Sequence, residues 1–265
     1  MQSENKKSFK KRLKSMFNVD AKRMFKTPLY YIMVAISLVM PILILVMTSM
    51  MDGTTTTDPN GNVTVMEGFK NVWQIIGTTS GDSSSMGMSL TSMCNINILF
   101  FLIAVSVCVF VSDDFRSGYA KNLFAVRSKK SDYALSKTII GFIGGASMII
   151  AFFIGSILGG AMVGLPFDVG SAGVYGITMC VLSKILLVPI FVSIYQFASV
   201  IAKQRLWLSI LISFAISMLM FTMVPIITPL NSTIINVILC AAGSVMFSAL
   251  FVYLSTVILN KKDIL

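Results

Sequence analysis

Six long apolar stretches constrain the fold of this chain more than any other feature of its sequence. They cover residues 29–51, 93–112, 138–163, 174–201, 206–224 and 233–259. Each has close to the roughly 20 apolar residues that a helix needs to cross the hydrocarbon core of a bilayer. Only 12% of the 265 residues are charged, too few to cover a soluble domain of this length. The sequence therefore predicts an all-α, polytopic membrane protein, in which residues 1–265 form a single transmembrane domain of six helices.

The basic residues predict the orientation of these helices. All but two of the 21 Lys and Arg residues lie in residues 6–26, 116–137, 203–205 and 261–262. The segments of the opposite side hold the acidic residues Asp52, Asp58, Glu67, Asp82 and Asp168. Because loops rich in Lys and Arg stay in the cytoplasm, we expect a multi-pass protein of the plasma membrane with both termini cytoplasmic. The net charge of +10 then reflects orientation and contacts to anionic membrane lipids, and we expect no nucleic-acid partner.

Residues 5–27, ahead of the first stretch, predict a helix in the membrane interface. The apolar positions follow one helix face, at Phe9, Leu13, Met16 and Phe17. Such a helix lies with its apolar side in lipid and its lysines among the phosphates. We expect Asp20 to cap a second short turn ahead of Pro28. The alternative is a disordered basic tail.

Residues 52–92 are the longest polar segment, an extracellular loop in this orientation. Its apolar residues again recur at helical spacing, at Met66, Phe69, Val72, Trp73 and Ile76. This spacing predicts a short helix on the outer leaflet. Loops of this length are often functional, so the segment is either a substrate gate or a plain connector.

The third apolar stretch carries a stripe of glycines. At about 100° per residue, four of them share a sector roughly 80° wide: Gly141, Gly145, Gly155 and Gly159. Small residues let a neighbouring helix approach closely. The stripe predicts helix packing rather than a ligand site.

The residue types that are missing exclude several classes of enzyme. The chain has no histidine and no Gly-Lys dipeptide. It therefore cannot build a Ser-His-Asp triad, an HExxH zinc site or a GxxxxGK phosphate loop. The four cysteines lie in or beside apolar stretches without metal-binding spacing. We expect no metal, no cofactor and no catalytic residue in this chain.

Lys184 is the charged residue that lies deep in an apolar stretch. Counted from Val174, it is about 15 Å into the span. Burying the charge costs at least about 2.5–3.5 kcal/mol, so it should face protein or water. We expect it in the substrate pathway, where it attracts an acidic group on the cargo, or in contact with a partner subunit. The alternative is a lysine that snorkels outward.

The segment after the second stretch carries the most specific pattern. Residues 113–137 read Asp-Asp-Phe-Arg-Ser-Gly-Tyr-Ala-Lys-Asn-Leu-Phe-Ala-Val-Arg-Ser-Lys-Lys-Ser-Asp-Tyr-Ala-Leu-Ser-Lys. This cytoplasmic loop resembles that of the permease subunits of ABC-2-type ATP-binding cassette transporters. There, an acidic residue ends the second helix, a glycine follows, and a basic residue and then a lysine lead into the third helix. Asp113 or Asp114, Gly118, Lys130 and Lys137 take these places.

The resemblance implies that this loop is a coupling loop that contacts an ATPase subunit. Residues 115–130 would form a helix that lodges in a groove of that subunit. Its basic residues are Arg116, Lys121, Arg127, Lys129 and Lys130, and the apolar contact would come from Phe115, Tyr119 and Phe124. The family often has Pro and Ser-Arg in this loop, where this chain has Arg127 and Lys129-Lys130. The alternative is a basic loop that faces lipid.

By the same resemblance, the chain is the permease subunit of a bacterial ATP-driven exporter. Its implied cargo is an amphipathic peptide, an antibiotic or a lipid-like molecule, as in bacteriocin-immunity, antibiotic-resistance and peptide-export permeases. The implied partners are separate ATPase subunits, which hold ATP and Mg²⁺, and a second permease, identical or homologous. The alternatives are an ATP-independent carrier or channel, and a polytopic membrane enzyme for which only Ser, Thr and Lys184 are available.

Overall fold

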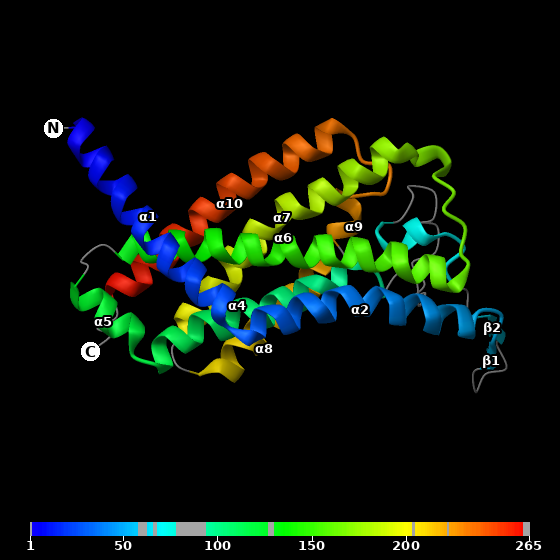
Figure 1. The fold of residues 1–265 in the computed structure, drawn as a ribbon, viewed down its shortest axis with the longest axis horizontal. Helices are drawn as coiled ribbons and strands as arrows, with labels where there is room; N and C mark the ends of the chain where they lie inside the picture. The colour runs from blue at the N-terminus through cyan, green and yellow to red at the C-terminus, as the bar shows by residue number, and fades with distance from the viewer. Residues whose placement is uncertain are drawn as a thin grey trace.

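The protein is a bundle of long helices (Figure 1). This computed structural model describes residues 2–57, 63–65, 68–77, 94–126, 130–202, 205–221 and 223–261. The helices are α1 (Gln2–Lys26), α2 (Pro28–Met51), α4 (Leu99–Arg116), α5 (Tyr119–Val126), α6 (Lys130–Val163), α7 (Gly173–Ala202), α8 (Leu206–Phe221), α9 (Val224–Ile227) and α10 (Ile234–Lys261). The described elements also include three 3-10 helices, η1 (Val72–Ile75), η3 (Ile96–Ile98) and η4 (Gly170–Ala172). Two short strands, β1 (Thr55–Thr57) and β2 (Val63–Val65), pair in antiparallel fashion.

Five helical segments are long and apolar enough to cross a membrane, so this is a helical membrane protein. They are α2, residues 96–116, α6, α7 and α10. The predicted fifth stretch, 206–224, is instead divided between α8 and α9, whose second residue is Pro225. At 1.5 Å per residue α8 is about 24 Å long, shorter than the roughly 30 Å hydrocarbon core. The predicted membrane class is confirmed, whereas the count of candidate spans among the described residues is five.

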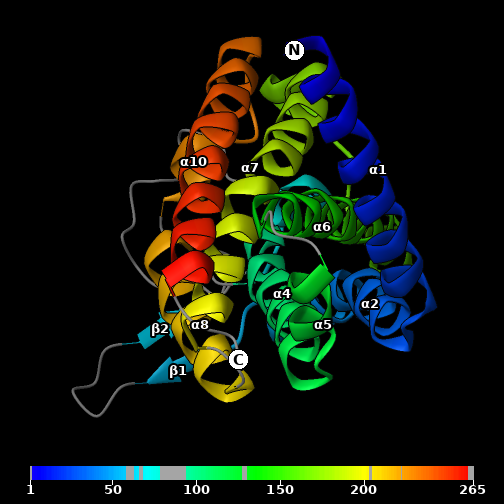
Figure 2. The ribbon, with the colours of Figure 1, turned by 90° about the vertical axis from the view of Figure 1, so that its left-hand side faces the viewer.

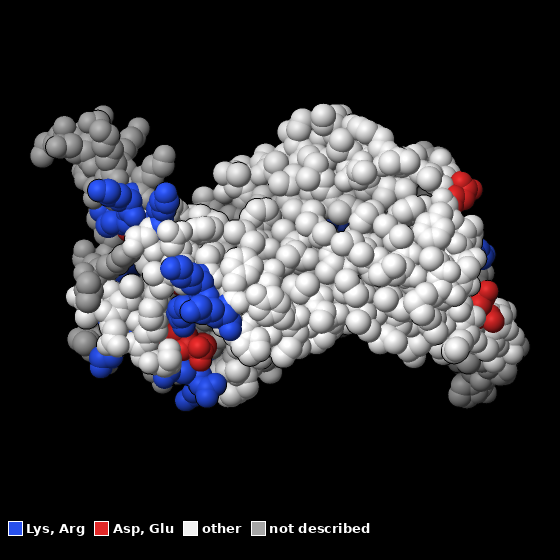
Figure 3. Space-filling view, in the orientation of Figure 1, with Lys and Arg blue, Asp and Glu red and all other residues white. Residues whose placement is uncertain are grey.

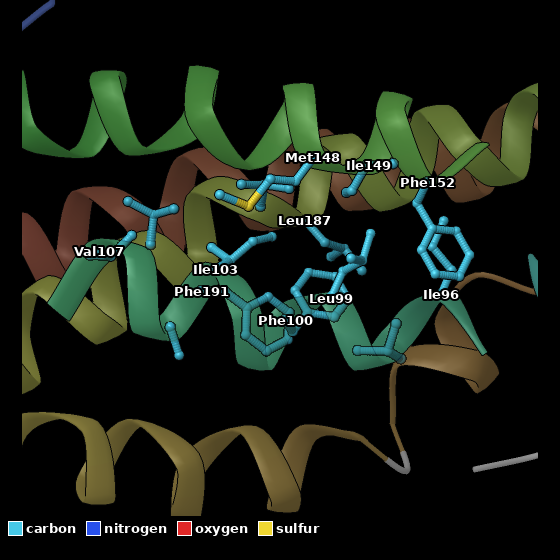
Figure 4. Close-up of a cluster of buried hydrophobic side chains, with 14 of the residues drawn as sticks. Ile96, Leu99, Phe100, Ile103, Val107, Met148, Ile149, Phe152, Leu187 and Phe191 are labelled. Atoms are coloured by element: carbon cyan, nitrogen blue, oxygen red, sulfur yellow. The ribbon is translucent and has the colours of Figure 1, made fainter. Parts of the chain in front are cut away.

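Helices α4 and α7 are the most buried of the candidate spans. Helix α4 packs against α6, α7 and α8, while α2 lies along α6 and α10 lies along α7 (Figure 2). Figure 4 shows the side chains that meet between the central helices: Ile96, Leu99, Phe100, Ile103 and Val107 face Met148, Ile149 and Phe152 of α6 and Leu187 and Phe191 of α7. The rings of Phe100 and Phe191 stack with centroids 4.1 Å apart.

The glycines of α6 lie where two different helices come close. A Cβ atom on Gly145 would be 2.5 Å from Val188 Cγ1, and Gly141 meets Val192 of α7 in the same way. One on Gly155 would collide with the carbonyl of Leu38, and one on Gly159 would be 2.9 Å from Ile42 Cα. The stripe therefore contacts α7 through its first half and α2 through its second, because α6 crosses both helices.

The segment before α4 differs from its prediction. Val72 to Ile75 form a short 3-10 helix, and Met66 lies outside the described residues. Asn71 caps this turn in a capping box with Gln74. Val72, Ile75 and Ile76 are fully buried, and Val72 sits against Gly160 of α6. A short helix is therefore present in the predicted segment, but it is a single 3-10 turn whose apolar side chains pack into the bundle.

The N-terminal helix is continuous and packs against the start of α6. Met16, Asp20 and Met24 are buried, whereas Phe9 is exposed. Asp20 lies inside α1 and forms an ion pair, so the prediction that it caps a second turn is wrong. The helix ends ahead of Pro28, which has the first-turn position of α2 that proline favours.

Candidate functional site: an ion-pair network behind helix α5

Charged side chains gather at the end of the molecule where α1, α5, the start of α6 and the end of α10 meet (Figure 3). We call this the basic end; its described residues include Arg12, Lys121, Lys130 and Lys261. The opposite end carries Asp52, Asp168 and Lys70, and the long face between them in Figure 3 is almost uncharged. The charge asymmetry predicted from the sequence is therefore present in the folded chain.

Lys137 of α6 is the centre of a buried ion-pair network at the basic end. Its ammonium lies 2.7 Å from Asp114 Oδ2 and 2.9 Å from Asp20 Oδ1. The side chains of Lys137, Asp114 and Asp20 are no more than 1% exposed. The ammonium also lies 3.8 Å from the ring centroid of Phe110, a cation–π distance. One side chain thus joins α1, α4 and α6.

Further side chains hydrogen-bond to the two carboxylates. Asp114 Oδ1 accepts a hydrogen bond of 2.6 Å from Arg23, and Tyr133 donates one of 2.9 Å to Asp114 Oδ2. Ser136 donates to Asp20 Oδ2 over 2.6 Å. Removing one member of such a network leaves an uncompensated buried charge and costs about 3–5 kcal/mol. The network therefore holds the three helices in one arrangement.

Arg23 extends the network to α5. Its guanidinium lies 4.0 Å from the ring centroid of Tyr119. Burial opposes the charge of Arg23, but Asp114, Tyr119 and Asp20 together outweigh it, so the pKa of Arg23 is raised. Burial likewise raises the pKa of Tyr119. At neutral pH this contact is therefore between a cation and a neutral ring.

Helix α5 follows a glycine turn and presents a polar outer face. Gly118 has φ +72°, a left-handed conformation that suits glycine and turns the chain between α4 and α5. The predicted single helix over residues 115–130 is therefore wrong, because α4 ends at Arg116 and α5 begins at Tyr119. Lys121, like Arg116, is exposed.

The aromatic residues predicted to contact a partner instead contact the rest of the bundle, Phe115 from the last turn of α4 and Tyr119 and Phe124 from α5. The rings of Phe115 and Phe124 meet the ring of Tyr133 edge-on, at 6.4 and 5.3 Å. Tyr119 lies on Arg23, so all three rings stabilise the chain's own fold. Lys130 donates to the carbonyl of Leu259 over 2.6 Å.

The other residues of the predicted coupling loop differ in whether they are exposed or buried. Asp113 is exposed and 4.0 Å from Arg23, whereas Asp114 and Lys137 are buried and make no surface contact. Arg127 and Lys129 lie outside the described residues. The exposed face available to a partner is formed by Asp113, Arg116, Lys121, Asn122 and Ala125.

Lys184 is buried at the far end of the bundle from this network. It is 1% exposed and donates to Asn97 Oδ1 over 3.0 Å and to Thr228 Oγ1 over 2.9 Å. Of the carboxylates that the structure describes, none pairs with it. The ammonium does not reach the surface, so the snorkelling alternative does not describe this structure. It joins α7 to η3 and to the segment after α9.

A row of serines on α8 is a polar feature that the sequence analysis missed. Ser209, Ser213 and Ser217 are spaced by four residues and are all buried. They hydrogen-bond to Ser199, Cys108 and Tyr195 over 2.6, 3.1 and 2.5 Å respectively. The spacing of four in an apolar helix was a readable signal, because hydroxyl groups in lipid need a partner on a neighbouring helix.

Comparisons with protein-family models, curated proteins and solved structures find no match to this chain. Among the residues described, no group of three or more Cys, Asp or Glu residues is placed to hold a metal ion.

Proposed function

We propose that this chain is the permease subunit of an ATP-driven exporter of the ABC-2 type. Its single transmembrane domain crosses a bacterial plasma membrane six times, with α8 and α9 together forming one crossing and the basic end in the cytoplasm. Separate ATPase subunits bind ATP and Mg²⁺ and dock at the basic end, and a second permease completes the pathway. The cargo is an amphipathic peptide, an antibiotic or a lipid-like molecule.

The observation that carries this proposal is the way in which side chains of α5 contact the rest of the bundle. This short helix lies between two candidate spans, with Lys121 exposed on its outer face and an inner face bound to the rest of the fold. Its inner contacts are Tyr119 on Arg23 and Phe124 on Tyr133, and both partners bond to Asp114. A force applied to α5 therefore acts on α1, α4 and α6 together, as a coupling element requires.

Lys184 supports a place for the cargo near the opposite end. Its ammonium has three N–H donors, of which Asn97 and Thr228 accept two. The remaining donor suits a carboxylate or phosphate of the cargo when the helices around it separate. This role is tested by transport of acidic and neutral cargoes in Lys184→Met.

Co-purification with the candidate ATPase tests the proposal. We expect the ATPase subunit to be retained by the wild-type chain in detergent, and ATP hydrolysis by the reconstituted complex to respond to cargo. Arg116→Glu combined with Lys121→Glu should release the ATPase, because the two changes reverse exposed charges at the end of α4 and on α5. Lys22→Glu is the matched control, since Lys22 is exposed on α1.

Two results would oppose the proposal. Equal retention and equal stimulated hydrolysis in the double variant would exclude α5 as the docking element. Transport by the purified chain in vesicles without ATP would instead favour an ATP-independent carrier or channel.

A further inference from the structure

A long groove runs between α6 and α10, with Pro189 of α7 among its lining residues. Its volume is about 590 Å³. Much of the lining is apolar and includes Leu135, Ile139, Phe142 and Val252. This volume is within the range of about 300–1,000 Å³ that is typical of sites for small ligands.

The length of the groove matches one leaflet of a bilayer. Its lining extends from Ser131 to Phe142 on α6 and from Ser244 to Thr256 on α10. At 1.5 Å per residue these segments are about 16 and 18 Å long. Half of the hydrocarbon core is about 15 Å thick. The groove therefore spans the depth that one acyl chain occupies.

The mouth of the groove lies at the basic end. Lys130 precedes the lining residue Ser131, and its ammonium reaches Leu259 O, one turn beyond the lining residue Thr256. That bond uses one of its three N–H donors. Lys261, in the last turn of α10, is exposed. Figure 2 looks onto this end, where the start of α6 and the end of α10 face the viewer.

An acidic residue near the mouth is already neutralised. Asp132 follows Ser131 and pairs with Arg12 Nε at 3.0 Å. The N-terminus of α6 adds partial positive charge at the same place. A headgroup at the mouth thus meets Lys130 and a helix N-terminus, an arrangement that favours a phosphate group.

We propose that the groove binds one acyl chain of an anionic phospholipid, whose phosphate group lies against Lys130. The proposal goes beyond the exporter function and does not depend on it.

Native mass spectrometry of the full chain tests this site. The protein is reconstituted into vesicles of equal parts phosphatidylglycerol and phosphatidylcholine, extracted in mild detergent, and its retained lipids are counted. We expect one phosphatidylglycerol per chain in preference to phosphatidylcholine. Lys130→Gln should lower retention about fivefold, because it removes the cationic contact. Lys261→Gln should leave retention unchanged, since residue 261 lies about 160° around α10 from the lining residues.

A second pair of variants separates groove from surface. Ala249→Trp places an indole in the groove and should abolish retention, while Met246→Trp on the same helix is the control, since Met246 is 72% exposed and does not line the groove. Lys22→Gln is the control for charge, and Val252→Trp replaces Ala249→Trp if the latter lowers the melting temperature.

Three results would overturn the proposal. These are equal retention of the two lipids, full retention in both groove-filling variants, and a dimer that those variants dissociate. The last would assign the groove to a second copy of the chain.

Discussion

The ammonium of Lys137 lies 2.7 Å from a carboxylate oxygen of Asp114, and both side chains are buried. Lys137 belongs to α6 and Asp114 to the last turn of α4. The pair therefore closes the chain segment that contains α5, and it fixes the ends of that segment relative to each other. Any movement of α5 must either carry α4 and α6 with it or break a buried ion pair.

Removing Lys137 should destabilise the protein strongly. In Lys137→Met, Asp20 and Asp114 lose the ammonium while remaining buried, and the free energy of unfolding should fall by about 3–5 kcal/mol. Asp20→Asn in the same chain should recover part of the loss, because it removes one stranded charge. Equilibrium unfolding in mixed micelles measures both. Lys22→Met, an exposed control, should change stability by no more than about 0.5 kcal/mol. Wild-type stability of Lys137→Met would contradict the network.

Glycine replacements in α6 and α10 should have opposite effects. Gly155→Ala places a methyl group against the carbonyl of Leu38. Helices α2 and α6 must then separate, which costs about 1–3 kcal/mol. Gly243→Ala in α10 meets no atom within 4 Å and should stabilise its helix by about 0.5–1 kcal/mol. Thermal unfolding in detergent compares the two. Equal melting temperatures would show that α2 and α6 do not approach closely at Gly155.

Asn97→Leu should be more damaging than Lys184→Met. The first leaves a buried ammonium with one acceptor fewer, and a hydrogen bond to a charged group contributes about 1.5–3 kcal/mol. The second strands two neutral acceptors, but it also removes a charge whose burial costs about 2.5–3.5 kcal/mol. We therefore expect Lys184→Met to remain folded. The melting temperatures of the single and double variants test this order of stability. A lower melting temperature for Lys184→Met than for Asn97→Leu would show that Lys184 has another partner.

Cysteine labelling should distinguish the two ends of the molecule. In a chain whose four native cysteines are replaced, we expect Asp168→Cys to react with an impermeant reagent in intact cells. Lys121→Cys should react only after the membrane is opened, because α5 lies at the basic end. Labelling of Lys121→Cys in intact cells would reverse the proposed orientation.

The sequence by itself determined the positions of the long helices. Length and hydropathy alone identify a span, and a helix satisfies its own backbone hydrogen bonds, so no knowledge of its neighbours is needed. The observed α2 and α7 begin and end close to the predicted stretches at 29–51 and 174–201. The distribution of Lys and Arg likewise gave the charge asymmetry between the two ends, because charge along the chain is independent of packing.

Only the tertiary structure decided which polar groups meet. Asp20 and Lys137 are far apart in sequence, and nothing in the spacing of either residue shows that they pair. The same holds for Lys184, whose partners Asn97 and Thr228 come from η3 and from the segment after α9. Amphipathic spacing also left open what covers an apolar face. The apolar residues around Val72 and Met16 pack on protein because α6 passes beside them, and that proximity arises from the folded arrangement of the helices.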